Sequence, residues 1–388
     1  MEMNRKQLNQ MCERDRFKFM HGTEKDIPFV KKCNADLLAK MIMMLCQSFG
    51  RRVSCPCLFV DEVRNRSMSG NLHNTMDNCR VEYRVINFRE RKSPYAHAKV
   101  GFIRPVVLML AACVSHAFIY AVYPIVGFKR ANSISRAALI AIYQNYLKAL
   151  HGKYQNVYCM TDHNFYSTIT CVDKHFESYV LQHGLVLDKD YYSLVLADHF
   201  LAWGKRSLEM MDYNPKVQVT GTYKFEKLKP LPPVKREQKC ILYCISIMDI
   251  KTVGDKIAAL LKAMAGKGYQ LKVKMHPGSF YKCAELEARF AEQKLEFYKE
   301  CDVADIDFDM AVIENSTILL DMLCLGKPFM IYDGKDGYFA QYSRILPWAE
   351  NDDELCDAIQ KALMGDFEST RAEILRNELN GGRCSIWD

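Results

Sequence analysis

The sequence lacks the features that mark secreted, nucleic-acid-binding and zinc-binding proteins. The charged stretch from Met1 to Arg16 contains no apolar segment, so no signal peptide is indicated and we expect a cytoplasmic protein. No long basic stripe with interleaved aromatic residues is present, which argues against nucleic acid as a partner. Of the 16 cysteines, only Cys55 and Cys57 form a tight pair. Because no second pair follows at ligand spacing, we expect reduced thiols and no zinc site.

Internal repeats and low-complexity segments are also absent, and the chain instead has the length and apolar content of a two-domain globular protein. Its 388 residues exceed one compact α/β unit, and 49% of them are hydrophobic, which excludes wholesale disorder. The net charge of +7 gives a mild preference for anionic partners such as phosphates, acidic glycans or a membrane surface.

A single uncharged run, from Pro105 to Phe128 between Arg104 and Lys129, is long enough to span a bilayer. Two interpretations are open. The run is either a transmembrane or interfacial segment, or a buried helix followed by a strand, broken near Pro124. Because charged elements typical of soluble proteins lie on both sides and no second such run exists, we favour the buried interpretation.

Strands and helices alternate through the stretch from Leu271 to Asp333. The expected order is strand Leu271–Met275, helix Tyr281–Lys294, strand Met310–Ile313, helix Ile318–Leu325 and strand Phe329–Tyr332. This alternation predicts a parallel sheet with helices on its faces. Ligands of such sheets bind at the carboxyl ends of the strands.

Short apolar segments in the first half predict a second unit of the same α/β class. The expected strands are Leu58–Val60, Val81–Phe88, Asn156–Met160, Tyr179–Leu181, Val195–Trp203 and Val217–Val219. Prolines and lysines are concentrated in residues 223–238, which indicates an extended, solvated linker. We therefore expect domains at 1–222 and 239–388, with the last helix, Phe367–Leu379, able to cross back onto the first domain.

Polar side chains at the strand ends of the second domain predict a phosphate site. Asn, Ser and Thr favour helix starts, where free N–H groups and the positive end of the helix dipole suit an anion. The candidates are Asn315, Ser316 and Thr317 at one helix start, His276, Pro277 and Gly278 after another strand, and Ser246 in the exit loop of strand Cys240–Ile245.

Two of these segments resemble motifs of a known group of enzymes. Lys274-Met275-His276-Pro277 resembles the His-Pro motif of bacterial sialyltransferases, Kdo transferases and CDP-glycerol glycerophosphotransferases. Glu314-Asn315-Ser316-Thr317, followed by Leu320-Asp321 and Gly326-Lys327-Pro328, resembles their Ser/Thr motif and the segment after it. Leu181-Gln182-His183-Gly184 resembles part of the N-terminal domain of surface-polysaccharide transferases. The resemblance implies a GT-B glycosyltransferase, an α/β fold of two Rossmann-like domains facing a central cleft.

The resemblance further implies that both motifs bind the phosphates of a nucleotide-sugar donor. It favours CMP over UDP, and it implies a glycan or lipid-linked glycan acceptor in capsule or lipopolysaccharide synthesis, reached through peripheral contact with the inner membrane. The acidic catalytic motif of sialyltransferases has no counterpart in the N-terminal half, which argues against sialic acid as the sugar. No cofactor is implied, because the nucleotide-sugar is itself the donor substrate.

The catalytic base is expected at a strand end of the first domain. His183 is the first candidate, and Asp188 or Asp190 in the following loop is the next. Weaker candidates are Asp162 and His163 at another strand end, and Lys205 and Arg206 either contact an anionic ligand or are solvated. Asp305 and Asp307 have the spacing of a metal-binding triplet but fall in a polar loop, so we expect a metal-independent reaction.

Three alternatives remain open on the same architecture. A polyol-phosphate transferase would use a CDP-alcohol and form a phosphodiester. An isomerase of the UDP-sugar 2-epimerase type would need no acceptor. A non-catalytic glycan-assembly or membrane-docking protein would bind no nucleotide.

Overall fold

The protein is described here from a computed structural model. The described residues are 27–62, 73, 82–88, 95–162, 164–186, 195–225, 228–231, 237–246, 250–276, 283–299, 301–314, 316–332, 338–365 and 368–380. Several residues of the predicted site lie outside these ranges, namely His163, Asp188, Asp190, Pro277, Gly278 and Asn315.

The N-terminal domain is built on a parallel six-stranded sheet with the order β2-β1-β3-β4-β5-β6. The strands are β1 (Cys57–Asp61), β2 (Tyr83–Asn87), β3 (Asn156–Cys159), β4 (Glu177–Leu181), β5 (His199–Ala202) and β6 (Val217–Val219). Its helices are α3 (Ile27–Gln47), α5 (Ile103–Val126), α6 (Phe128–Lys148), α7 (Phe165–Cys171) and α9 (Lys205–Met210). Strand β1 is buried throughout, as expected of a parallel strand covered on both faces.

Helix α5 corrects the interpretation of the apolar run. It is one continuous helix, and only 17% of its most apolar 18-residue window is buried. The predicted buried helix and following strand are therefore wrong. Pro124 is tolerated because it falls in the last turn, and Gly127, with φ at 79°, ends the helix before α6 begins. Apolar content alone does not distinguish an exposed helix from a buried one.

The C-terminal domain repeats the arrangement with the strand order β12-β11-β10-β7-β8-β9. The strands are β7 (Cys240–Cys244), β8 (Gln270–Lys274), β9 (Glu296–Tyr298), β10 (Met310–Ile313), β11 (Phe329–Tyr332) and β12 (Trp348–Ala349). The helices are α10 (Ile250–Met264), α11 (Cys283–Arg289), α12 (Ile318–Leu325), α13 (Leu355–Met364) and α14 (Glu368–Leu379), with short 3₁₀ turns η3 (Ala291–Gln293), η4 (Val303–Asp305), η5 (Ala340–Tyr342) and η6 (Asp352–Glu354).

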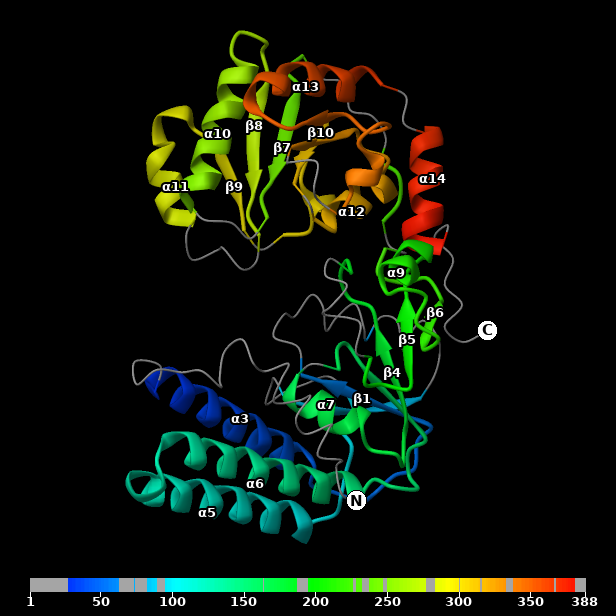
Figure 1. The fold of residues 1–388 in the computed structure, drawn as a ribbon. Helices are drawn as coiled ribbons and strands as arrows, with labels where there is room; N and C mark the ends of the chain where they lie inside the picture. Colours follow the sequence, from blue (N-terminus) through cyan, green and yellow to red (C-terminus); the bar gives the residue numbers. More distant parts are fainter. Residues whose placement is uncertain are drawn as a thin grey trace.

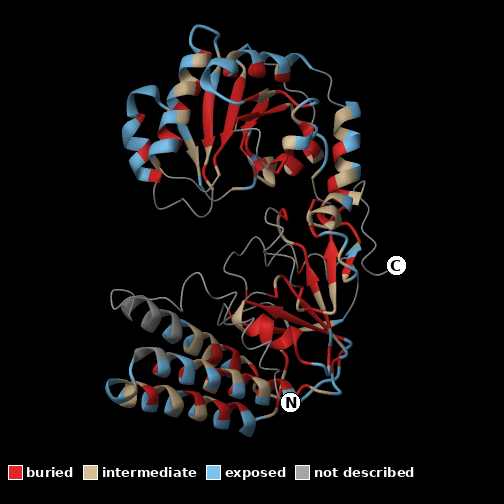
Figure 2. Cartoon of the chain, viewed as in Figure 1, coloured by how far each residue is buried: buried red, intermediate tan, exposed pale blue. Residues whose placement is uncertain are grey.

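Alternate residues of these strands supply two separate cores. Tyr243 and Val312 pack with α10 and α13 on one face of the sheet, whereas Leu242 and Ile313 pack with α12 and α14 on the other. The central strands are therefore enclosed on both sides (Figure 2). The two edge strands, β9 and β12, were not predicted, because three and two residues are too few to show a periodic pattern.

The two domains are joined on one side of the molecule, where α14 packs against α9 (Figure 1). The backbones meet closely at Gly204, where an added Cβ would lie 2.4 Å from the carbonyl oxygen of Asn377. Phe225 and Leu231 of the predicted linker pack into the C-terminal core. The expectation of a solvated linker is therefore wrong at these residues, because their apolar side chains find a core to enter.

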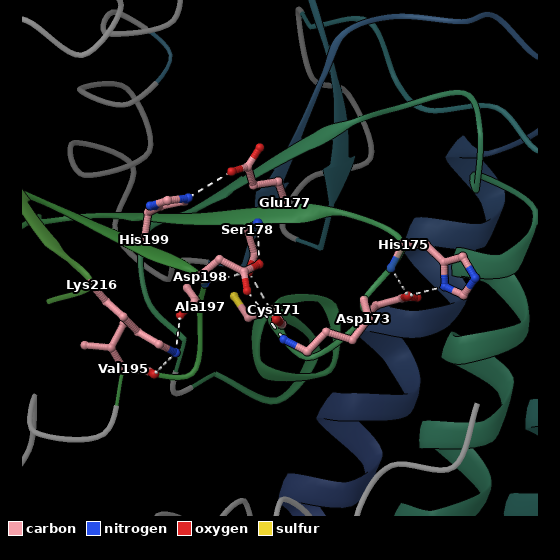
Figure 3. A network of polar contacts seen from close by, with 11 residues as sticks. Cys171, Asp173, His175, Glu177, Ser178, Val195, Ala197, Asp198, His199 and Lys216 are labelled. Atoms are coloured by element: carbon pink, nitrogen blue, oxygen red, sulfur yellow. Dashed lines mark hydrogen bonds and ion pairs between the residues drawn. The ribbon is translucent and has the colours of Figure 1, made fainter.

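A polar network ties together the amino-terminal ends of β4, β5 and β6, at the sheet edge away from the C-terminal domain (Figure 3). Asp198 accepts hydrogen bonds from the Ser178 backbone N–H at 3.0 Å and from its hydroxyl at 2.7 Å. Lys216 donates to the carbonyl oxygens of Val195 and Ala197. Burial alone would raise the pKa of Asp198, but the Ser178 hydrogen bonds and Lys174 outweigh it and lower that pKa.

Candidate functional site

The strand order of the C-terminal domain reverses at β7 and β10, so a ligand crevice is expected at the carboxyl ends of these two strands. The chain runs from β7 through β8 to β9 on one side of the sheet and returns to the other side of β7 with β10. Parallel sheets bind ligands at such reversals. Ser246 is the second residue after β7, and Glu314 directly follows β10.

Glu314 organises this crevice. Its side chain is fully buried, and its carboxylate accepts hydrogen bonds from the Tyr243 hydroxyl at 2.7 Å and from the Ser246 N–H at 3.0 Å. The Ser246 hydroxyl donates to the same oxygen as the Ser246 N–H, and Lys256 of α10 lies 2.8 Å from the other. Four donors therefore fix the exits of β7 and β10 to each other and to α10.

The start of α12 faces the same edge of the sheet. Thr317 is its N-cap residue but makes no side-chain capping hydrogen bond, and the Ser316 hydroxyl lies 3.5 Å from the Ile318 N–H. Neither hydroxyl is thus tightly engaged by the helix. An α-helix start with two such hydroxyls is suited to bind phosphate oxygens.

His276 follows β8, the strand beside β7, and is half-buried. Burial and then the neighbouring Lys274 lower the pKa of this histidine. A lowered pKa favours the neutral ring at pH 7, so His276 would contact an anion as an N–H donor and Lys274 would supply the positive charge.

His183 follows β4 in the N-terminal domain. Its Nδ1 lies 2.8 Å from the carbonyl oxygen of Met160. A carbonyl oxygen only accepts, so Nδ1 carries the hydrogen and Nε2 of the neutral ring is the acceptor nitrogen. Burial is the main cause that lowers the pKa of His183; the Met160 contact opposes it, and Lys224 adds to it. The ring is thus fixed in the tautomer that a general base requires.

Lys224 and Asp321 connect the two strand edges. Lys224 lies after β6 with its ammonium 4.9 Å from the centre of the Trp203 ring. Burial lowers the pKa of Lys224, opposed by the charge of Asp321 on α12. Burial raises the pKa of Asp321 to about 6, opposed by Lys224 and Lys274. Lys224 also contributes to the lowered pKa of His183, and Lys274 to that of His276.

The corresponding helix start in the N-terminal domain is already filled. The buried Glu62 carboxylate accepts from the Tyr166 N–H at 2.9 Å and the Ser167 N–H at 2.8 Å, at the start of α7. Burial raises the pKa of Glu62 to about 7. Because a carboxylate of the protein itself occupies this position, an incoming phosphate is expected at α12 instead.

Several predicted residues lie away from this arrangement. Asp162 is buried and accepts from the Leu196 N–H at 2.6 Å, so it holds a loop. Arg206 lies 3.4 Å from Gln341 and close to the Tyr338 ring, between α9 and η5.

Lys205 is exposed and lies 3.6 Å from Glu209 on the same helix. Asp305 and Asp307 are exposed and precede β10, at the edge of the sheet opposite the crevice.

Two further polar features can be separated from the crevice. The rings of His151 and His175 stack with their centres 3.8 Å apart, and each ring contacts a different oxygen of the buried Asp173 carboxylate. The three side chains together could hold a metal ion. These residues precede β3 and β4, so they lie at the amino-terminal edge of the sheet.

A cavity of about 310 Å³ lies beside Lys256, lined by Thr252, Asp255, Tyr332, Glu350, Asn351 and Asp352. Three carboxylates against a single lysine make this cavity unsuitable for a phosphate.

Four residues of these two sheet edges were not predicted as site residues, namely Glu314, Lys224, Asp321 and Glu62. Glu314 offered a signal, because it is an acid directly after a fully apolar strand and within a quoted motif. Lys224 offered none, since it is one of several lysines in a linker-like segment.

No protein-family model and no curated protein sequence matches the chain. Solved structures nevertheless share its fold. The putative UDP-N-acetylglucosamine 2-epimerase from Listeria monocytogenes covers 86% of this chain and 94% of its own, with 10% identity and a TM-score of 0.51. Anabaena HepE, in complex with UDP and glucose, covers 86% and 96%, with 12% identity and a TM-score of 0.51.

The lipopolysaccharide outer core galactosyltransferase WaaB covers 83% of this chain and 94% of its own, with 14% identity and a TM-score of 0.50. At such low identity the likeness concerns architecture. It confirms the predicted fold class: the chain has the two-domain α/β architecture called GT-B, in which the carboxyl edges of two parallel sheets face each other (Figure 1).

Proposed function

We propose that the protein is a glycosyltransferase that moves a sugar from a nucleotide donor to a hydroxyl group of a glycan or lipid-linked glycan. The observation that carries this proposal is that the carboxyl edges of the two parallel sheets face each other (Figure 1), with His183 after β4 on one side and the start of α12 on the other. It places a potential base and a potential phosphate site on opposite sides of one space.

The donor phosphates would bind at the start of α12. The N–H groups of its first turn and the hydroxyls of Ser316 and Thr317 supply hydrogen bonds, and Lys274 supplies a positive charge. These groups would stabilise the charge that develops on the leaving nucleotide, the role that a metal ion has in other transferases. The reaction is accordingly proposed to be metal-independent.

His183 would activate the acceptor. Its Nε2 takes the proton of the acceptor hydroxyl while that oxygen forms a bond to the anomeric carbon of the donor sugar. The bond from this carbon to the phosphate oxygen breaks, and the electron pair leaves with the nucleotide. The Met160 carbonyl oxygen stabilises the imidazolium through Nδ1–H. This role stays a prediction, as do those of Asp188 and Asp190.

The nucleotide base is proposed to be uracil, with cytosine as the second choice. The sequence motifs favour CMP, but the similar Anabaena structure holds UDP. The similar fold of an enzyme of the lipopolysaccharide outer core supports a place in cell-surface polysaccharide synthesis, and we propose a cytoplasmic site for the reaction.

An isomerase is the second candidate, supported by the similar fold of the Listeria epimerase. The crevice around Glu314 would serve either reaction, because both bind a nucleotide-sugar. Polyol-phosphate transfer and a non-catalytic role have no specific support from the geometry.

Incubation with UDP-hexoses tests the proposal. The purified protein is given each donor with and without a mixture of oligosaccharide acceptors, and UDP and sugar products are measured by mass spectrometry. A transferase releases UDP and extends an acceptor only when one is present. An epimerase converts the donor without any acceptor. Absence of nucleotide binding, measured by calorimetry with UDP and CMP, would refute both.

A further inference from the structure

The outer face of α5 is apolar along its whole length. We define the α5 apolar face by Ile103, Val107, Leu110, Val114, Phe118 and Ile125, which recur on one side of the helix. Their exposed fractions range from 54% for Val107 to 85% for Ile125. Soluble monomers rarely leave so continuous an apolar stripe in water.

The opposite side of α5 is held firmly by the domain. Leu108, Ala112 and Ile119 are buried, and the helix packs against both α3 and α6. Figure 2 shows α5 at the outer edge of the N-terminal domain, with exposed residues along its free side. The helix is long and apolar enough to cross a membrane, but crossing would remove this buried side from its core. It is therefore suited to lie along a surface.

The positive charge near α5 indicates which kind of surface this helix would bind. Between Glu90 and Asp162 the sequence contains nine lysines and arginines and no acidic residue. The positive charge of this segment alone is therefore larger than the net charge of the whole chain, +7. Arg104 in the first turn of α5 and Arg130 in the first turn of α6 are exposed. A second copy of the chain would bring two cationic faces together, whereas an anionic bilayer is complementary to this one.

We propose that the α5 apolar face docks the protein on an anionic phospholipid bilayer. The helix lies in the plane of the membrane with this face among the acyl chains, and Arg104 and Arg130 reach the lipid phosphates. The inference does not depend on the catalytic activity proposed above.

Vesicle co-sedimentation tests the apolar part of the proposal. The full chain is mixed with vesicles of phosphatidylglycerol and phosphatidylethanolamine, and bound protein is measured in the pellet. We expect wild type to bind and Phe118→Glu to lose at least tenfold in partition. Met364→Glu is the matched control, because Met364 is also an exposed helical residue, 85% exposed, in the other domain. It should bind as wild type does.

The cationic part has its own readout. Arg104→Gln and Arg130→Gln should each weaken partition onto anionic vesicles about fivefold, since each basic residue near such a surface contributes about 1 kcal/mol. They should have little effect with neutral phosphatidylcholine vesicles.

Two outcomes would overturn the proposal. One is equal binding of wild type and Phe118→Glu. The other is a wild-type dimer, seen by light scattering, that Phe118→Glu dissociates, because the occupant would then be a second copy.

Discussion

Replacing Glu314 by glutamine tests whether the buried carboxylate organises the proposed nucleotide-binding crevice. The substitution preserves size and shape but exchanges one acceptor oxygen for an amide donor. In wild type one oxygen accepts from the Tyr243 hydroxyl and Lys256, and the other accepts from the Ser246 N–H and hydroxyl. A glutamine amide can satisfy only one of these two sides fully, whichever way it is turned.

The magnitude follows from the donors left without an acceptor. If the glutamine oxygen faces Lys256, its NH₂ meets the Ser246 N–H, and if it faces Ser246, its NH₂ meets the ammonium of Lys256. A buried donor without an acceptor costs about 1–3 kcal/mol, and more when it is charged. We expect a loss of about 2–3 kcal/mol in the free energy of unfolding, and weaker UDP binding because the exits of β7 and β10 are no longer fixed.

Two measurements check the reasoning together. Urea unfolding gives the change in stability, and calorimetry below the unfolding transition gives the affinity for UDP. Glu378→Gln is the matched control, because Glu378 is also buried and accepts from two tyrosine hydroxyls, Tyr338 and Tyr342, each at 2.8 Å. It should reduce stability without changing the affinity. An unchanged UDP affinity in Glu314→Gln, or an equal loss in Glu378→Gln, would refute the organising role of Glu314.

Three further predictions concern the histidine and the domain junction. His183→Asn keeps an N–H donor for the carbonyl oxygen of Met160 but removes the base, so we expect transfer to slow by about 10²–10⁴-fold with an unchanged circular dichroism spectrum; a wild-type rate would exclude His183 as the base. Because burial lowers the pKa of His183, kcat/KM should fall with acid only below the ordinary histidine value of about 6.5 and be level from pH 7 to 8, and an inflection above pH 7 would contradict this. Gly204→Ala should lower stability by about 1–3 kcal/mol in thermal unfolding, since its methyl group would meet the backbone of α14, whereas Gly184→Ala, whose Cβ meets nothing within 4 Å, should leave stability nearly unchanged.

The sequence predicted most accurately the helices and strands whose residue patterns are compatible with only one type of element. Met310–Ile313 is a short apolar segment between polar residues, and Ile318–Leu325 follows a capping sequence and ends at a glycine, so the bounds of β10 and α12 agree with the predictions. Helix α5 was misinterpreted because its exposed and buried sides are equally apolar. Only the packing of α3 and α6 against one side distinguishes them.

The candidate site likewise contains some residues that could be predicted from the sequence and others that could not. His183 and Ser316 could be selected in advance, because the ends of strands can be located from the alternation of apolar and polar residues. Lys224 could not, and Asp321 was quoted only within a motif, since the shifted pKa values of both arise from burial and from each other's charge across the two domains. Such contacts depend on how the domains sit together, which local patterns do not contain.

The return of α14 to the first domain has a mechanical consequence. The chain enters the C-terminal domain after β6 and returns with α14, which packs against α9 of the N-terminal domain as well as α12. Strand β6 and helix α14 lie on the same side of the molecule (Figure 1). Two such connections allow one domain to rotate about the line that joins them. Twisting one domain over the other would stretch one of the two connections. We therefore expect any closing movement of the two domains to be a rotation about that line.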